Sequence, residues 1–252
     1  MSEEEGTFRL ELGLNDSLEF KKLIKALSKI VDEVGVICSE SGLEFRAMNA
    51  SNTAMIIAKL PAESFDTFEI TGDFKFELFF DQFANAVKNF GAKEMHVTID
   101  QQKIKLEGRS GSKRKTMELP QLVTSIADAR KKPTLEFDFS AFIDSSELAE
   151  IISDFRNFGA YKIQVAYEND RFSVKHEDYN GNFCVELEDV DIETPGEFSS
   201  FYNVEFLKQI TSLLKLGKTV KFSAKSQFPL CLEIESPTCS VEYILAPMID
   251  NA

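Results

Sequence analysis

The chain repeats one pattern four times: an extended segment, a short amphipathic helix and then further strands. The repeat becomes visible when apolar residues are aligned at helical spacing. In the first copy the apolar stripe consists of Phe20, Leu23, Ile24, Leu27 and Val31. The other stripes are Phe83, Ala86, Val87 and Phe90; Leu148, Ile151, Ile152 and Phe155; and Phe206, Ile210, Leu213 and Leu214. Each stripe predicts a short amphipathic helix with one apolar face.

The segments around these helices have strand character. Extended, Phe-rich stretches precede them at residues 8–14, 74–80, 135–142 and 198–204. Strand-like segments follow the first helix at 34–38, 43–48 and 54–60, and the fourth at 220–224, 230–235 and 240–245. The repeating unit is therefore strand, helix, three strands, which predicts an α+β fold. Some α+β proteins show helices and strands without any repeat, but the matching order of elements favours a true repeat.

Glycines lie near the ends of three of the predicted helices. Gly91, Gly159 and Gly217 follow the second, third and fourth helices. Helices commonly close with a left-handed residue, and glycine adopts that conformation without steric cost. We therefore expect a left-handed closing residue at each of these positions.

A long connection divides the chain into halves of two units each. Residues 119–133 are bounded by Pro120 and Pro133 and show no clear periodicity. Connections of this length are usually functional or serve as linkers. The sequence thus predicts an N-terminal domain at 1–118, a connecting loop at 119–133 and a C-terminal domain at 134–252.

Positive charge gathers on helices although the chain as a whole is acidic. Its net charge of -14 should repel nucleic acid on average. On three of the four helices, however, lysines lie outside the apolar stripe. They are Lys21, Lys22, Lys25 and Lys29 on the first, Lys88 on the second, and Lys208 and Lys215 on the fourth. The third helix instead offers Glu150, Ser153 and Asn157, with Arg156 only at the edge of its outward face.

Lysine rows of this kind suit contacts with phosphates. Without interleaved aromatic residues they provide neither base readout nor stacking on single strands. A single such helix could equally be an ordinary solvated one, because lysine is a good helix former. Recurrence on three helices favours sequence-independent contact with duplex DNA.

No catalytic or metal-binding pattern is recognisable. His96 and His176 are isolated, and residues 108–113 lack the glycine spacing of a phosphate loop and predict a hairpin turn. The carboxylates between Glu186 and Glu193 are interpreted as a solvated loop. We expect neither enzymatic activity nor a cofactor or metal, although an enzyme of unrecognised type that uses the carboxylate-rich loops stays open as an alternative.

Cysteine placement and hydropathy indicate an intracellular, soluble protein. Cys38, Cys184, Cys231 and Cys239 lie far apart and mostly within apolar runs, so we expect buried reduced thiols. The acidic start at residues 1–5 is not typical of a signal peptide, and no apolar run is long enough to span a membrane.

The end of the chain carries the most specific motif. Residues 241–249, Val-Glu-Tyr-Ile-Leu-Ala-Pro-Met-Ile, resemble the closing strand and Leu-Ala-Pro tail of the proliferating cell nuclear antigen (PCNA) family, the eukaryotic and archaeal sliding clamps. Residues 20–27, 42–49 and 64–68 support the resemblance in order and spacing. It extends over essentially the whole chain after Gly6. We expect the archaeal type; the protein would act in the cytoplasm if archaeal and in the nucleus if eukaryotic.

The resemblance implies a DNA clamp: a trimeric ring of two-domain subunits, with helices lining a central hole and sheets outside. Such a ring is a processivity factor that encircles duplex DNA and takes part in replication and repair. In this family the connecting loop and the tail form a pocket for short client peptides with apolar and aromatic anchors. The matching residues here are Met48, Leu122, Ile126, Pro229, Ile244, Ala246 and Pro247. The implied partners are DNA polymerase, clamp loader, flap nuclease and ligase.

The resemblance also implies how subunits join. Family members pair edge strands, which correspond here to residues 113–119 of one subunit and 181–186 of its neighbour. The implied interface residues are Lys115, Met117, Asn182, Phe183 and Val185. The chain departs from the family pattern in its non-basic third helix and at Met248, so a homotrimer and a heterotrimer both stay open. A checkpoint-type clamp subunit is the alternative within the same fold.

Overall fold

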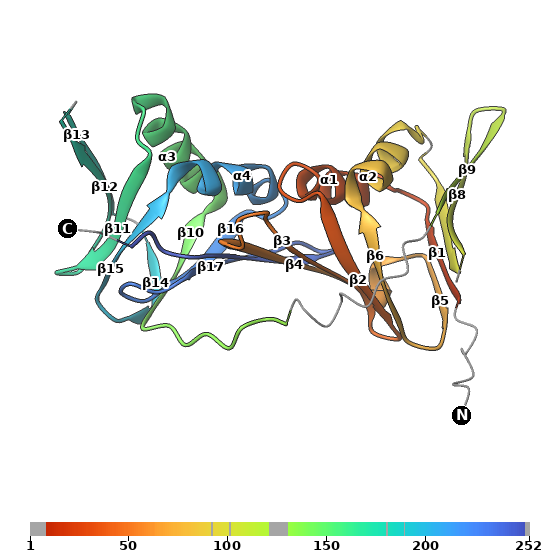
Figure 1. Cartoon of the computed structure of the whole chain (residues 1–252), viewed down its shortest axis with the longest axis horizontal. Helices are drawn as coiled ribbons and strands as arrows, with labels where there is room; N and C mark the ends of the chain where they lie inside the picture. Colours follow the sequence, from red (N-terminus) through yellow and green to blue (C-terminus); the bar gives the residue numbers. More distant parts are fainter. Residues whose placement is uncertain are drawn as a thin grey trace. The chain divides into compact units, whose positions relative to one another are not determined.

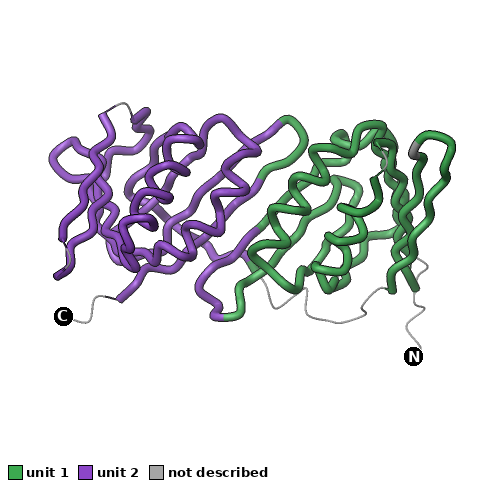
Figure 2. Tube along the Cα trace, turned by 90° about the horizontal axis from the view of Figure 1, so that it is seen from above, with its two compact units in different colours: residues 1–50, 57–131, 237–240 green, residues 51–56, 132–236, 241–252 purple. Residues whose placement is uncertain are grey.

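The chain forms two compact units (Figure 2). The computed structural model describes residues 9–91, 93–100, 102–120, 131–179, 181–188 and 190–249. Unit 1 contains the first part of the chain through residue 50, residues 57–131 and residues 237–240. Unit 2 contains residues 51–56, residues 132–236 and the last part of the chain from residue 241. Each unit therefore includes a short segment taken from the other half of the sequence.

Unit 1 has two helices on one face of its strands (Figure 1). Its helices are α1 (Leu18–Leu27) and α2 (Phe80–Asn89), with a short 3₁₀ turn, η1 (Ala62–Ser64). Its strands are β1 (Arg9–Leu14), β2 (Glu33–Ser39), β3 (Gly42–Met48), β4 (Ala54–Pro61), β5 (Thr67–Thr71), β6 (Phe74–Phe79), β7 (Met95–Asp100), β8 (Lys103–Ser110) and β9 (Lys113–Pro120). They lie in the orders β5-β1-β7-β8-β9 and β4-β3-β2-β6.

Unit 2 is built in the same way. Its helices are α3 (Ser145–Phe158) and α4 (Val204–Leu214). Its strands are β10 (Phe139–Asp144), β11 (Lys162–Glu168), β12 (Arg171–Asp178), β13 (Gly181–Leu187), β14 (Asp191–Pro195), β15 (Phe198–Asn203), β16 (Thr219–Ala224), β17 (Leu230–Glu235) and β18 (Ser240–Leu245). They lie in the orders β14-β10-β16-β17-β18 and β13-β12-β11-β15.

The predicted fourfold repeat is confirmed. Each helix follows one strand and precedes three, and the first and third copies add a further strand, β5 or β14. The two added strands hold equivalent places, since β5 pairs antiparallel with β1 and β14 pairs antiparallel with β10. The α+β fold predicted from the repeat is therefore present in both halves.

Apolar stripes of the helices form the cores, as their spacing predicts. In α1 the side chains of Phe20, Leu23, Ile24 and Leu27 are buried against unit 1. In unit 2, Phe139 of β10 is the centre of an aromatic cluster, and its ring lies 4.8 Å from that of Tyr167 and 5.0 Å from that of Phe198. Such close aromatic pairs bury large apolar area and fix the sheets beneath the helices.

The helices of unit 2 begin with side-chain caps. Asp144 accepts hydrogen bonds from the backbone N–H groups of Ser146, at 2.8 Å, and Glu147, at 3.1 Å. These bonds and one from the Ser146 hydroxyl lower the pKa of the Asp144 carboxyl. Asn203 caps α4 in the same way, accepting from Glu205 N at 2.8 Å. The caps satisfy backbone donors that would otherwise lack partners.

Two local expectations from the sequence are confirmed. Gly159 closes α3 with φ of 92°, and Gly91 follows α2 with φ of 62°, both left-handed. The segment at 108–113 is a hairpin between β8 and β9, and Gly111 adopts φ of 62° at its turn.

Three local expectations are wrong. Gly217 has no left-handed φ; a Cβ there would lie 2.8 Å from the Glu235 carbonyl oxygen, so glycine is needed for close approach. The carboxylate-rich stretch is not a loop throughout, because Glu186 lies in β13 and Glu193 in β14. Cys184 is exposed, because strand alternation turns it away from the core.

The other three cysteines, Cys38, Cys231 and Cys239, are buried as expected. Burial raises the pKa of the Cys231 thiol to about 12, which keeps it protonated near neutral pH. Among the described residues, no helix is long and apolar enough to cross a membrane.

Candidate nucleic-acid interface and peptide pocket

Helix α1 presents a row of lysines opposite its buried stripe. Lys22 and Lys25 are exposed, whereas Lys21 is half-buried. Lys29 is also exposed, but it lies in the turn after α1, because the helix ends at Leu27 and not near Val31 as the apolar spacing predicts. Lys22 Nζ lies 2.7 Å from the Glu19 carboxylate, three residues earlier on the same helix. This exposed pair contributes little to stability and is open to competition from other anions.

Lys21 differs from the others in its surroundings. Burial lowers its pKa, the nearby Lys115 lowers it further, and the carboxylate of Asp16 acts in the opposite direction. A phosphate oxygen brought to Lys21 would act as Asp16 does, favouring the charged ammonium.

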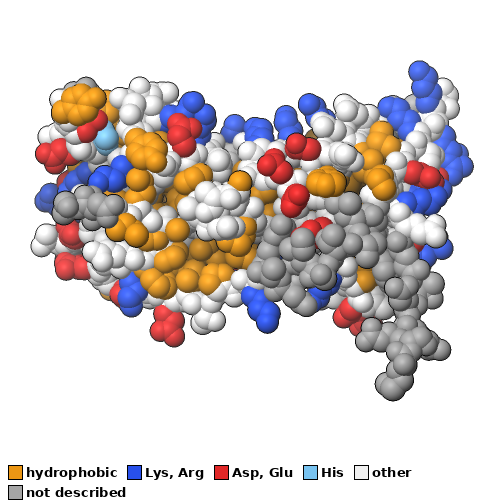
Figure 3. All heavy atoms as spheres, viewed as in Figure 1, with side chains coloured by type: hydrophobic (Ala, Val, Ile, Leu, Met, Phe, Trp, Pro, Cys, Tyr) orange, Lys and Arg blue, Asp and Glu red, His pale blue; other side chains and the backbone are white. Residues whose placement is uncertain are grey.

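The remaining predicted lysines are less concentrated. Lys88 is exposed in the last turn of α2, Lys208 is half-buried on α4, and Lys215 is exposed just after α4. Blue side chains project along the upper edge of Figure 3, where Figure 1 draws the helices. Further basic side chains gather over β8 and β9.

Helix α3 has the opposite character. Its exposed face carries Glu147, Glu150 and Asp154. Its one basic residue, Arg156, lies 3.3 Å from the Glu205 carboxylate of α4, so its charge is already offset. The sequence-based exclusion of α3 from the lysine faces agrees with this arrangement.

The net charges of the helices show the contrast. Helix α1 contains three lysines and one glutamate, for a net charge of +2, whereas α3 contains three acidic residues and one arginine, for −2. Helices α2 and α4 each carry one acidic and one basic residue, for a net charge of zero. Within the described helices, the strongest attraction for a polyanion is therefore at α1.

The C-terminal tail is held to unit 2 by backbone hydrogen bonds. Ala246 N donates to the Thr53 carbonyl at 2.8 Å, and Met248 N donates to the Phe201 carbonyl at 2.7 Å. Beside this tail lies a cavity of about 530 Å³. Its lining consists of Ser199, Ser200, Phe201, Ser226, Gln227, Pro247, Met248 and Ile249. The size is in the range of ligand pockets.

Hydrogen bonds fix the rim of this cavity. Ser200 Oγ donates to the Lys225 carbonyl at 3.0 Å and accepts from Gln227 N at 2.7 Å. The ammonium of Lys162 lies 4.4 Å above the ring of Phe201. The cavity thus combines a preformed backbone, apolar walls and polar serine groups.

The predicted peptide-pocket residues are distributed unevenly. Pro247 lines the cavity, Ala246 and Pro229 are half-buried in unit 2, and Ile244 is buried in β18. Met48 is half-buried at the end of β3 in unit 1. Leu122 and Ile126 lie outside the described residues. Hydrophobic side chains also gather over β10, β16 and β17 on the face drawn in Figure 3.

Sequence reasoning missed most of the cavity lining. Ser226 and Gln227 lie in the turn before Pro229, which was selected, and Gln227 adopts a positive φ of 54°. The Ser-Gln turn beside a selected proline was the available signal. Ser199 and Phe201 gave none, because strand residues on the open face look alike in the sequence.

The predicted joining strands are both at sheet edges. Strand β9 pairs with β8 and β13 with β12, and each is outermost in its described sheet. The selected side chains mostly turn inward: Lys115 Nζ donates to the Phe90 carbonyl at 3.1 Å, and the Phe183 ring lies 4.6 Å from that of Phe155. Met117 and Val185 are half-buried, while Asn182 is exposed. What the edges offer is chiefly their backbone.

Comparison with known proteins connects this architecture to a family. The sequence profile of the proliferating cell nuclear antigen N-terminal domain matches residues 9–106. A solved structure of the proliferating cellular nuclear antigen of Entamoeba histolytica superposes with a TM-score of 0.84, covering 95% of this chain and 99% of that one at 18% identity. The chain has the PCNA fold. The resemblance stated from the sequence is thereby confirmed.

Curated relatives of this PCNA-like chain are archaeal. The DNA polymerase sliding clamp of Nitrosopumilus maritimus is 26% identical, covering 97% of this chain and all of the relative. That of Nanoarchaeum equitans is 25% identical, covering 93% of this chain and 98% of the relative. The PCNA likeness thus extends over both units.

Proposed function

We propose that this chain is a DNA sliding clamp, a processivity factor whose subunits close into a trimeric ring around duplex DNA. The observation that carries the proposal is a PCNA fold over 95% of the chain, in which α1 is the most positively charged of the described helices. In this arrangement the helices face the DNA and the sheets face outward. The clamp would act in DNA replication and repair, in the compartment that holds the chromosome.

Contact with DNA would be electrostatic. The ammonium groups of Lys21, Lys22, Lys25 and Lys29 would exchange between successive phosphates, with Lys88, Lys208 and Lys215 adding weaker contacts. Because such contacts carry no sequence information, the ring could slide. The acidic remainder of the chain would keep its outer surface away from DNA.

Ring closure would use β9 of one subunit and β13 of the next. Both strands are sheet edges with backbone groups available for pairing. Lys113 and Arg114 on β9 are exposed, and so is Glu186 on β13. Opposite charge at the two edges favours another copy of this chain as the neighbour. Because the two edges differ, repeated contacts form a closed ring only when the rotation from one subunit to the next adds up to a full turn.

Client proteins would bind at the tail of unit 2. We propose that the cavity beside Pro247 accepts part of a short peptide. Ala246, Pro229 and Ile244, which belong to the same unit, are proposed to contribute to the docking region. Polymerase, clamp loader, flap nuclease and ligase are the proposed clients. A client bound to the clamp would stay on DNA because the ring itself encircles the DNA.

The native mass of the chain expressed alone tests the proposed ring. Three copies of a 28.4 kDa chain should give a particle of about 85 kDa by mass photometry or light scattering. An edge charge reversal, Arg114→Glu, should shift the population toward monomer, and Lys59→Glu on β4 is the control. A particle that stays monomeric at micromolar concentration would contradict closure by identical chains.

A further inference from the structure

The hairpin of β8 and β9 is more positively charged than any of the described helices. Each of its two strands carries three basic residues and one acidic residue, for a net charge of +4, whereas α1 carries +2. In a chain whose net charge is -14, the hairpin is thus a second local concentration of positive charge, which favours an anionic partner. The basic residues are Lys103, Lys105, Arg109, Lys113, Arg114 and Lys115.

Strand alternation divides these residues between two sides of the hairpin. Lys115 lies on the side of the helices, because its ammonium donates to the Phe90 carbonyl, at the end of α2, at 3.1 Å. Lys113, two residues nearer the turn, lies on this same side. Arg109 and Arg114 are opposite each other on the other side. Figure 1 draws the turn of the hairpin on the same side of unit 1 as α1 and α2.

The lysine row of α1 continues onto the helix side of the hairpin. Burial lowers the pKa of Lys21, and the charge of Lys115 lowers it further. The ammonium groups of these two residues, one on α1 and one on β9, are therefore close enough to repel each other. An anion bound between two such groups removes the repulsion and favours the charged form of both.

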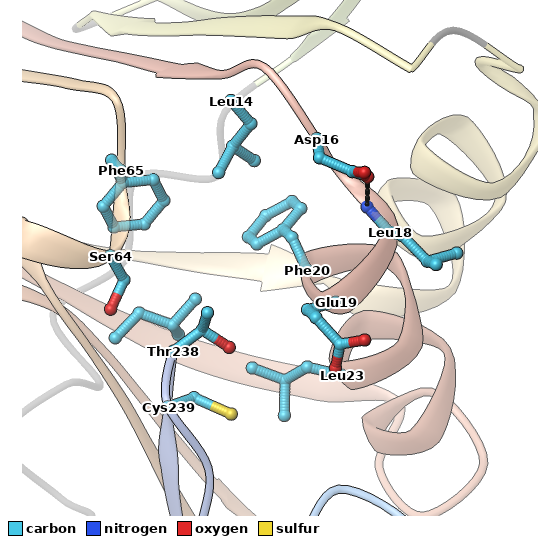
Figure 4. A pocket seen from close by; sticks show the side chains of 11 residues that line it. Leu14, Asp16, Leu18, Glu19, Phe20, Leu23, Ser64, Phe65, Thr238 and Cys239 are labelled. Atoms are coloured by element: carbon cyan, nitrogen blue, oxygen red, sulfur yellow. Dashed lines mark hydrogen bonds between the residues drawn. The ribbon is translucent and has the colours of Figure 1, made fainter.

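The carboxylate that acts on Lys21 is engaged elsewhere. Asp16 lines a cavity of about 340 Å³ at the start of α1 (Figure 4). Its Oδ1 accepts a hydrogen bond from Leu18 N at 3.1 Å, the dashed line in Figure 4, and its Oδ2 lies 3.7 Å from Lys93 Nζ.

The hairpin lysines have no carboxylate of their own. Neither Lys113 nor Lys115 forms an ion pair within the part of the chain that the structure describes, and the Phe90 carbonyl that accepts from Lys115 carries no net charge. By contrast, Arg114 on the other side lies 3.0 Å from the Glu107 carboxylate. The positive charge that is not offset is thus on the side that continues the lysine row of α1.

We propose that the helix side of the β8–β9 hairpin binds backbone phosphates of duplex DNA through Lys113 and Lys115. One phosphate lies between Lys115 and Lys21, and Lys113 contacts another nearer the turn. The inference rests on the proposed clamp function and adds a strand element to the helices that contact DNA. The acidic edge of a second copy is the competing occupant, and continuity with the lysine row of α1 favours DNA.

Neutralising one basic residue on each side of the hairpin tests the inference on the full chain. Lys113 and Arg109 are both exposed near the turn, and neither forms an ion pair among the described residues. Lys113→Gln should lower affinity for a short duplex roughly fivefold near 0.1 M salt and reduce the slope of its salt dependence by roughly one. Arg109→Gln removes the same charge from the other side and should change neither quantity.

A second lysine variant and the native mass complete the test. Lys115→Gln, which keeps an N–H donor for the Phe90 carbonyl, should weaken binding as Lys113→Gln does. Anisotropy titrations over a salt series measure affinity and slope, and mass photometry should show an unchanged assembly. Equal loss in Lys113→Gln and Arg109→Gln would reveal an effect of net charge and overturn the inference. Retained affinity with a lower native mass in Lys113→Gln would also overturn it, because the hairpin would then serve contact with another copy.

Failure of this inference can be told apart from failure of the proposed clamp. If the unmodified chain did not bind duplex DNA, both would be overturned. If Lys22→Gln together with Lys25→Gln on α1 weakened binding while Lys113→Gln and Lys115→Gln did not, the clamp would stand and only the hairpin contact would be overturned.

Discussion

At the level of single residues, the lysines of α1 are the groups that we propose contact DNA most directly. All lie off the buried stripe, so their charge can be reversed without disturbing the core. Burial lowers the pKa of Lys21, and the Asp16 carboxylate partly offsets this effect. A phosphate placed beside Lys21 would likewise favour its charged form.

Reversal of this charge should weaken retention on DNA. The triple variant Lys21→Glu, Lys22→Glu, Lys25→Glu should lower affinity for duplex at least roughly tenfold near 0.1 M salt and flatten the salt dependence. Electrophoretic mobility or anisotropy titrations over a salt series measure both effects. Circular dichroism should show an unchanged fold.

The strand variant Lys59→Glu, Lys75→Glu is the control for this prediction. Both lysines are exposed on strands, not helices. If it reduced affinity and salt dependence as much per charge as the α1 triple variant does, the effect would be one of net charge and α1 would have no special role.

At the level of elements, the four helices are equivalent in packing but not in charge. Each buries an apolar stripe against its sheets, because folding requires it. The outward faces are free of that requirement, and α1 and α3 carry net charges of +2 and −2. If the helices face DNA as proposed, the negative face of α3 should repel phosphates rather than bind them.

Charge reversal on α3 tests this asymmetry. Glu150→Lys together with Asp154→Lys should tighten duplex binding and slow sliding, because two repulsive groups per subunit become attractive. Binding titrations and single-molecule diffusion on DNA measure the two effects. The neutral pair Ser153→Gln and Asn157→Gln, on the same exposed face, should change neither. Unaltered binding by the lysine variant would place α3 away from the DNA.

The tail is the second element with a separable role. Pro247→Ala and Ala246→Asp should weaken binding of client peptides, since Pro247 lines the cavity and Ala246 precedes it in the chain. Peptide titrations by calorimetry measure the loss, and the native mass should stay that of the unmodified chain. Loss of the assembly with peptide binding retained would show that the tail serves subunit contact.

Much of this architecture could be predicted from periodicity, whereas the sites could not. The stripe from Phe20 to Leu27 identifies a helix and its buried face, because burial imposes a regular spacing. Cys184 was predicted to be buried but is exposed. Successive side chains of a strand face opposite sides of the sheet, and the sequence of a single edge strand does not show which side is buried. Ser226 and Gln227 line a cavity only because tertiary folding brings their turn beside Pro247.

Roles that depend on close approach were equally hidden. Gly217 near a helix end suggested a left-handed cap, but its function is to let the backbone pass Glu235. The cavity at α1 joins the Leu18 region with Thr238 and Cys239, which are more than two hundred positions away in the sequence. Neither of these contacts could be predicted from the residues adjacent in the sequence.

At the level of the whole molecule, a closed ring would have a property that no single residue possesses. A ring linked to DNA by topology should stay on a closed circle even when its electrostatic contacts are weakened, because leaving requires an opened interface. It should leave linear DNA by sliding off the ends. Simple phosphate binding makes no such distinction.

Retention on circular compared with linearised DNA is the most direct test of this claim. The chain, loaded on nicked circular plasmid, should remain bound through gel filtration at high salt and should be released when a restriction enzyme linearises the plasmid. Blocking both ends with bound protein should restore retention. Equal loss from circular and linear DNA at the same salt concentration would contradict the sliding clamp.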